Sequence, residues 1–108
     1  MKFIEEENIM TIKEMFIQAH SLPVNQYGLF KIDGEEILHI YNSGAQINVI
    51  ESGEPAWSII DYGDKFDVIP VADGRNRWEA AVPYQPSADV NTLPERIKNA
   101  FKLAGIVA

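Results

Sequence analysis

The chain has 108 residues, of which 46% are hydrophobic and 23% are charged, and it contains no cysteine. This length fits a single domain, residues 1–108, and the composition is that of a folded chain. Without cysteine, disulfides, thiolate metal sites and a cysteine nucleophile are excluded. The net charge of −7, from 16 acidic and 9 basic residues, disfavours direct binding to nucleic acid.

The N-terminal segment and the hydropathy pattern bear on the location of the protein. No apolar run is long enough to cross a membrane. Glu5, Glu6 and Glu7 stand where a signal peptide needs an apolar stretch. We therefore expect a cytoplasmic protein without membrane contact. Residues 1–10 are expected to form a flexible lead-in, and the sequence leaves open whether translation starts at Met1 or at Met10.

A first helix is predicted over residues 11–20. Thr11 followed by Glu14 is a capping box, in which each side chain can bind a backbone amide near the other. Pro23 ends the helix, because the residue before a proline avoids helical torsion angles. The apolar residues recur at helical spacing and form one stripe, Ile12, Met15, Phe16 and Ala19.

A β-hairpin is predicted next, over residues 27–41. Asp33-Gly34 lies between two apolar stretches, and this pair suits a two-residue turn in which both residues have positive φ. Such a turn fixes the register of the two strands. The predicted pairs are Ile32 with Glu35, Lys31 with Glu36, and Phe30 with Ile37.

Four more strands are predicted, over residues 46–51, 56–62, 66–71 and 75–82, with turns at short regular intervals. Residues 52–55 and 83–86 are expected to be a turn and a loop. This spacing is typical of an antiparallel sheet and not of βαβ units. In the last strand Trp78, Ala80 and Val82 share one face, and Trp57 and Trp78 are expected to anchor the core.

A second helix is predicted near the C-terminus. Thr92 and Glu95 form another capping box, with Pro94 in the first turn, and Gly105 ends the helix. The fold class is therefore α+β: an antiparallel β-meander of about five to six strands, flanked by an N-terminal and a C-terminal α-helix. The apolar stripe of this helix is Leu93, Ile97, Ala100, Phe101 and Ala104.

The residues that could carry chemistry do not form a recognisable active site. His20 and His39 are the only histidines, and no nucleophile-elbow sequence accompanies them. Asp61, Asp64 and Asp67 surround a turn, but their spacing does not fit a calcium-binding loop. We therefore predict no catalytic residue, no cofactor and no metal, and expect that the protein is not an enzyme.

The distribution of charged residues says more about function than the candidate catalytic residues do. Successive turns of a meander alternate between the two ends of the sheet, so the first, third and fifth turns share one end. These turns are rich in carboxylates, with Arg75 as the expected main basic neighbour. Loop tyrosines are good contact residues for a protein partner. The predicted partner-binding residues are Asp33, Glu35, Glu36, Glu51, Glu54, Asp73, Tyr62 and Tyr84.

These features favour a small acidic, non-catalytic protein-binding module that docks onto a basic surface of a partner protein. An inhibitor of a host or competitor system, of the immunity, antitoxin, anti-restriction or anti-CRISPR type, is the expected role. One alternative is a small-ligand-binding or enzymatic domain with a pocket between sheet and helices, using His39, Tyr41 and Arg77. Another is a structural or assembly subunit of a phage or larger complex. The sequence leaves the oligomeric state open.

Overall fold

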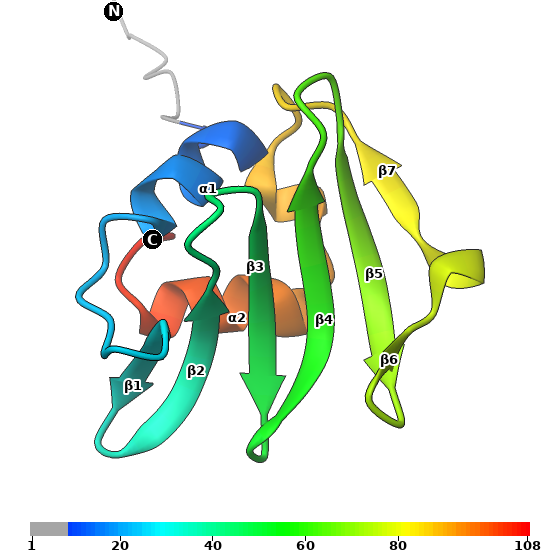
Figure 1. Cartoon of the computed structure of the whole chain (residues 1–108). Helices are drawn as coiled ribbons and strands as arrows, with labels where there is room; N and C mark the ends of the chain where they lie inside the picture. The colour runs from blue at the N-terminus through cyan, green and yellow to red at the C-terminus, as the bar shows by residue number, and fades with distance from the viewer. Residues whose placement is uncertain (1–8) are drawn as a thin grey trace, which may run out of the picture.

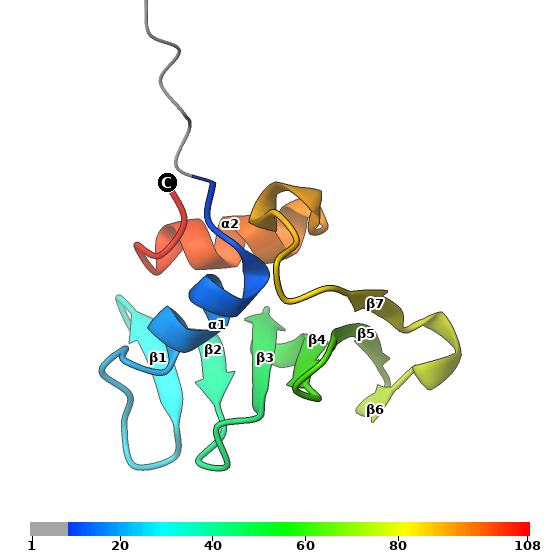
Figure 2. The ribbon, with the colours of Figure 1, turned by 90° about the horizontal axis from the view of Figure 1, so that it is seen from above.

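The computed structural model describes residues 9–108, and the predictions for residues 1–8 lie outside this range. A seven-stranded antiparallel sheet is preceded by one α-helix and followed by another (Figure 1). Both helices lie on the same face of the sheet, so the protein has two layers (Figure 2). This architecture confirms the predicted α+β class and the antiparallel meander between terminal helices.

The elements follow one another with short connections, and neighbouring strands of the meander are consecutive in the chain. Two short 3₁₀ turns, η1 and η2, precede the last strand and the last helix. The bounds are α1 Ile12–Ala19, β1 Leu29–Ile32, β2 Glu35–Ile40, β3 Gln46–Glu51, β4 Glu54–Asp61, β5 Phe66–Ala72, β6 Arg75–Asn76, η1 Trp78–Ala80, β7 Val82–Tyr84, η2 Val90–Thr92 and α2 Glu95–Leu103.

Helix α1 forms as its sequence predicts. The Thr11 hydroxyl accepts a hydrogen bond from the Glu14 amide at 3.1 Å, and the Glu14 carboxylate accepts one from the Thr11 amide at 2.9 Å. The capping box is thus complete, and the predicted apolar stripe is buried. The backbone around Thr11 also pairs with the segment before α2, since Ile12 N donates to Ala88 O at 2.9 Å.

The β1–β2 hairpin is confirmed except for one pair. Asp33 and Gly34 have φ angles of 52° and 83°, and Lys31 pairs with Glu36 as predicted. Phe30, however, pairs with Leu38 instead of Ile37, because a β-bulge interrupts the register between Phe30 and Lys31. A bulge leaves one residue unpaired and changes the direction in which neighbouring side chains point. Ile37 and Leu38 are accordingly both buried in the same core.

The third turn is shorter than predicted. Ser52 and Gly53, with φ angles of 53° and 81°, make a two-residue turn on their own. Glu54 and Pro55 therefore already belong to β4, where they pair with the last two residues of β3. The strand accordingly begins two residues earlier than expected, and the turn at its start is a second tight hairpin.

The prediction of one strand over residues 75–82 is wrong, because the segment forms two short strands, β6 and β7, with η1 between them. Val71 of β5 pairs with Asn76 of β6, whereas Val68 pairs with Val82 of β7. The edge segment has more residues between these pairs than β5 has, so the excess folds out of the sheet as η1. Trp78 lies in η1 and is 54% exposed, so it is not the predicted core anchor. Pro83 and Tyr84, expected to begin a loop, form β7 together with Val82 instead.

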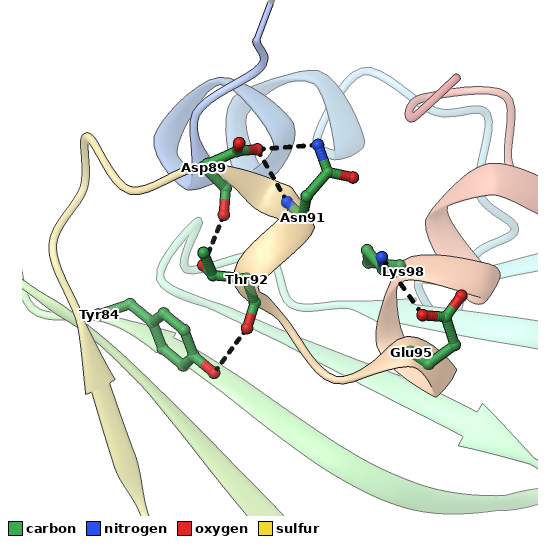
Figure 3. A network of polar contacts seen from close by, with 6 residues as sticks. All are labelled: Tyr84, Asp89, Asn91, Thr92, Glu95 and Lys98. Atoms are coloured by element: carbon green, nitrogen blue, oxygen red, sulfur yellow. Dashed lines mark hydrogen bonds and ion pairs between the residues drawn. The ribbon is translucent and has the colours of Figure 1, made fainter.

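The start of α2 also differs from the prediction. The residue before Pro94 cannot be helical without a steric clash, and Leu93 is extended, with φ −72° and ψ 157°. The helix therefore begins at Glu95, with Pro94 at its N-cap position and no side-chain cap. Thr92 instead donates its hydroxyl hydrogen to Asp89 O at 2.6 Å, within η2 (Figure 3). The prediction of a Thr92–Glu95 capping box is thus wrong. Gly105 ends the helix as predicted, with φ +79°.

The hydrophobic core lies between the sheet and the two helices. Because side chains alternate along a strand, one face of the sheet supplies most of its strand members. The opposite face, which neither helix covers, is called the helix-free face below and includes His39, Asn48 and Ser58. The core members are Ile12, Met15, Phe16 and Ala19 of α1; Ile37, Leu38, Ile40, Ile47, Val49, Ile59, Phe66 and Val68 of the sheet; Val90 and Leu93; Ile97, Ala100 and Phe101 of α2; and Ile106 and Val107.

Candidate functional site

The three tight hairpin turns lie at the same end of the sheet. Residues 33–34, 52–53 and 73–74 connect β1 to β2, β3 to β4 and β5 to β6, and all three lie at the lower end in Figure 1. The meander therefore brings the predicted acidic residues to a common end, which we call the acidic end. Its six carboxylates are Asp33, Glu35, Glu36, Glu51, Glu54 and Asp73.

Two of the six carboxylates have a basic partner, and neither partner is the expected Arg75. Arg96 of α2 donates through Nε to Glu51 Oε2 at 2.9 Å and through Nη2 to Glu51 Oε1. Arg77 Nη2 lies 3.1 Å from Asp73 Oδ2. Within residues 9–108, the other four carboxylates of the acidic end form no ion pair.

The pairing of Glu51 with Arg96 has a local physical reason. Glu51 and Glu54 are direct partners across β3 and β4, and two like charges in that position repel. The fork of the guanidinium neutralises Glu51 and so relieves this repulsion. Its hydrogen bond to Glu51, followed by the attraction between the charges, raises the pKa of Arg96 above its usual value.

A groove of about 290 Å³ opens at the acidic end, between β2, β3 and α2. Its walls carry the carboxylates of Glu35 and Glu51, and Leu103 stands at its rim with 63% of its surface exposed. The groove, which we call the acidic groove, thus combines an apolar floor with the carboxylate of Glu35, which forms no ion pair among the described residues, and with the paired charges of Glu51 and Arg96. Its lining residues are Glu35, Ile37, Val49, Ile50, Glu51, Ser52, Arg96, Asn99, Ala100 and Leu103.

The two predicted tyrosines do not join this site. Tyr62 is exposed in the turn between β4 and β5, at the opposite end of the sheet, where Lys65 Nζ lies 5.3 Å from its ring centroid. Tyr84 is half-buried against the core, and its hydroxyl is 3.5 Å from Thr92 O (Figure 3). Burial raises the pKa of Tyr84. The predicted partner-binding set therefore divides between two ends of the molecule.

The sequence-based prediction missed the residues that turn the acidic end into a groove. Arg96 lies 45 positions from Glu51, so no local spacing indicates their contact. Ile50 and Leu103 look like ordinary members of a strand and a helix. The signal that could have found Leu103 is its position on α2, since it lies outside the predicted apolar stripe and yet is a large apolar residue.

The histidines are on separate elements. His20 caps α1 and donates from Nδ1 to Phe16 O at 2.9 Å, while His39 lies on the helix-free face of β2. Tyr41 lies on that face too, so neither His39 nor Tyr41 lines a pocket between sheet and helices. Arg77 follows β6 and is paired with Asp73. Of the three residues suggested for a ligand pocket, His39 and Tyr41 therefore lie side by side on the helix-free face, and Arg77 is not with them.

Within residues 9–108, no three His, Asp or Glu side chains are grouped so that they could hold a metal ion. In the same residues, no helix is long and apolar enough to cross a membrane. Comparison with protein-family models, with curated proteins and with solved structures found no match for the chain in any of the three.

Proposed function

We propose that this chain is a small, non-catalytic protein-binding module that binds a basic segment of a partner protein in the acidic groove. The observation that carries the proposal is the combination of charge and apolar surface in one place. The groove has a floor of Ile37, Val49 and Ile50 and lies at the end of the sheet where four carboxylates form no ion pair among the described residues.

The two parts of the groove suit two kinds of side chain on a partner. The apolar floor suits one aliphatic or aromatic side chain, whose burial supplies most of the binding energy at an interface. Glu35 on the wall, and Glu36 and Glu54 nearby along the acidic end, suit lysine or arginine on either side of that anchor. The net charge of −7 adds a longer-range attraction that speeds the encounter with a basic surface.

Within this proposal, the narrower role is that of an inhibitor which covers a basic functional surface, of the immunity, antitoxin, anti-restriction or anti-CRISPR type. The chemistry supports it in one respect: carboxylates displayed at the tips of tight hairpins can replace an acidic or phosphate-bearing substrate on such a surface.

A displayed random-peptide library tests the proposal without knowledge of the partner. We expect selected peptides to share one large apolar residue flanked by lysine or arginine. Their affinity should fall when salt is raised from about 50 mM to about 500 mM, because screening weakens attraction between exposed charges. Glu35→Lys should weaken binding about tenfold at low salt, and Leu103→Ala about fivefold.

Matched variants separate the groove from general effects of charge and apolar surface. Asp64→Lys makes the same change of charge at the opposite end of the sheet, and Ile17→Ala removes an exposed apolar side chain from α1 instead of α2. Both should bind the selected peptides as the unchanged protein does. Selected peptides without basic residues, or equal losses in Glu35→Lys and Asp64→Lys, would show that the acidic groove is not the binding site.

A further inference from the structure

The helix-free face carries a polar network that no helix covers. Asn48 of β3 and Ser58 of β4 are only 7% and 0% exposed, although they lie on the face without helices. Ser58 Oγ donates to Asn48 Oδ1 at 2.9 Å, and Gln46 Nε2 donates to Ser58 Oγ at 2.8 Å. These bonds satisfy the buried polar groups and fix the side chains in one arrangement.

This network holds two aromatic rings in place beside it. Asn48 Nδ2 donates to the hydroxyl oxygen of Tyr41 at 3.1 Å. The ring of Tyr41 stacks on the imidazole of His39, with centroids 4.2 Å apart and planes 25° from parallel. The hydrogen of the Tyr41 hydroxyl stays available to an acceptor outside the network. The hydrogen bond to Tyr41 and the stacking of His39 on its ring therefore favour one arrangement of the two rings.

The loop before β1 forms a wall next to these rings. Asn25 Oδ1 accepts hydrogen bonds from Tyr27 N at 2.8 Å and Leu29 N at 3.0 Å, and Gly28 O accepts one from Ile40 N at 2.8 Å. Gly28 has φ +79°, and a Cβ at this position would lie 2.6 Å from Ile40 O. Only glycine therefore lets the loop lie this close to β2.

Between the loop and the rings lies a groove of about 380 Å³, which we call the aromatic groove. Three of its residues carry aromatic rings, and three others carry a carboxamide or a hydroxyl. None is a carboxylate, a lysine or an arginine, although 23% of the chain is charged. The lining residues are Gln26, Tyr27, Gly28, His39, Ile40, Tyr41, Asn42 and Ser43.

We propose that the aromatic groove binds a neutral sugar ring. The groove volume lies near the lower limit of small-ligand pockets, which is the size of one or two such rings. Tyr27 is 68% exposed at the rim and offers a ring face to the C–H face of a sugar. Carboxamides and hydroxyls both donate and accept, as sugar hydroxyls do, so Gln26, Asn42 and Ser43 match a ring with several of them.

The charge of the chain narrows the class of ligand further. A nucleotide or a sugar phosphate would bring negative charge to a protein of net charge −7 and find no lysine or arginine among the lining residues. A neutral saccharide meets no such repulsion. This site is separate from the acidic groove, which lies at the other end of the sheet, so the two proposals stand or fall independently.

NMR titration of the full chain with neutral mono- and disaccharides tests this inference, because it detects weak binding and locates it. At least one saccharide should give saturable shifts centred on the amides of Tyr27, His39 and Asn42. Uncharged nucleosides form a second arm. Shifts caused by nucleosides alone, or no saturable shift from any saccharide, would overturn the proposal.

Variants at the rim separate stacking from a general effect on the fold. Tyr27→Ala should weaken binding about tenfold, because the exposed ring face is lost, while Tyr27→Phe should retain most of the affinity. Tyr62→Ala removes another exposed tyrosine outside the groove and should bind as the unchanged protein does. Equal affinity in Tyr27→Ala and the unchanged protein would overturn the assignment of the site.

Discussion

The two faces of the sheet bury their residues by different physical means. On the face toward the helices, Leu38, Ile47 and Ile59 are fully buried because a second layer covers them. On the helix-free face, Asn48 and Ser58 are almost as deeply buried, and their neighbours within the sheet and their hydrogen bonds accomplish this. Apolar packing against the helices thus buries one face of the sheet. On the helix-free face, hydrogen bonds hold the side chains of Asn48 and Ser58 in position.

This difference predicts how each face responds to the loss of a side chain. A buried apolar side chain contributes through the area it removes from water and through close packing, so its loss leaves a cavity. A buried hydrogen-bonded group contributes little net energy itself, yet its removal leaves its partner unpaired. The helix-covered face should therefore show the larger effects on stability, and the helix-free face the stronger coupling between neighbours.

The largest expected effect is that of Phe101→Ala. Phe101 projects from α2 into the core and is fully buried, so its truncation should lower the free energy of unfolding by about 3–5 kcal/mol. Leu103→Ala, on the exposed side of the same helix, should change it by less than about 0.5 kcal/mol. Urea denaturation of both variants measures the difference. Similar losses in the two variants would mean that α2 does not pack on the sheet through Phe101.

A smaller effect is expected from Asn48→Ala on the helix-free face. It removes the acceptor of Ser58 and the donor to Tyr41, which should destabilise the fold by about 1–3 kcal/mol. Ser58→Ala and the double variant complete a thermodynamic cycle. The double variant should cost less than the sum by at least about 0.5 kcal/mol, since the second change removes a group that the first left unpaired. Additive losses would argue against a connected network.

The sequence predicts those parts of the fold that depend on local chemistry. The Thr11–Glu14 capping box, the Asp33-Gly34 turn and the helix end at Gly105 each need only a few adjacent residues, and all three form. The errors arise where the local signal is ambiguous or a stronger one overrides it. The pattern around Trp78 alternates as a strand does, but η1 folds out of the sheet. Pro94 moves the start of α2 to Glu95, so Thr92 does not cap the helix.

The candidate site is predictable to a similar degree. Alternation of turns in a meander is enough to gather the six carboxylates at one end, which the topology confirms. The acidic groove needs the contact of α2 with β3, where Arg96 binds Glu51, and no local spacing encodes it. The aromatic groove likewise depends on Gly28, whose sequence context gives no sign that the loop packs against His39.

The smallest expected effect is a change in how stability depends on pH, caused by Tyr84 at the edge of the sheet. Tyr84 packs against the core from β7, and burial raises its pKa because the charged phenolate is less well solvated there. A folded-state pKa above the unfolded value, about 10, gives a contribution to stability that is complete below that pH and is lost as pH rises through the folded-state pKa.

Tyr84→Phe should therefore flatten the loss of stability with pH above about 10, while Tyr62→Phe at the exposed turn serves as the control. Urea denaturation at neutral and alkaline pH measures these slopes. An unchanged slope in Tyr84→Phe would mean that the hydroxyl of Tyr84 is as well solvated in the folded protein as in the unfolded chain, and that the covered layer ends before β7.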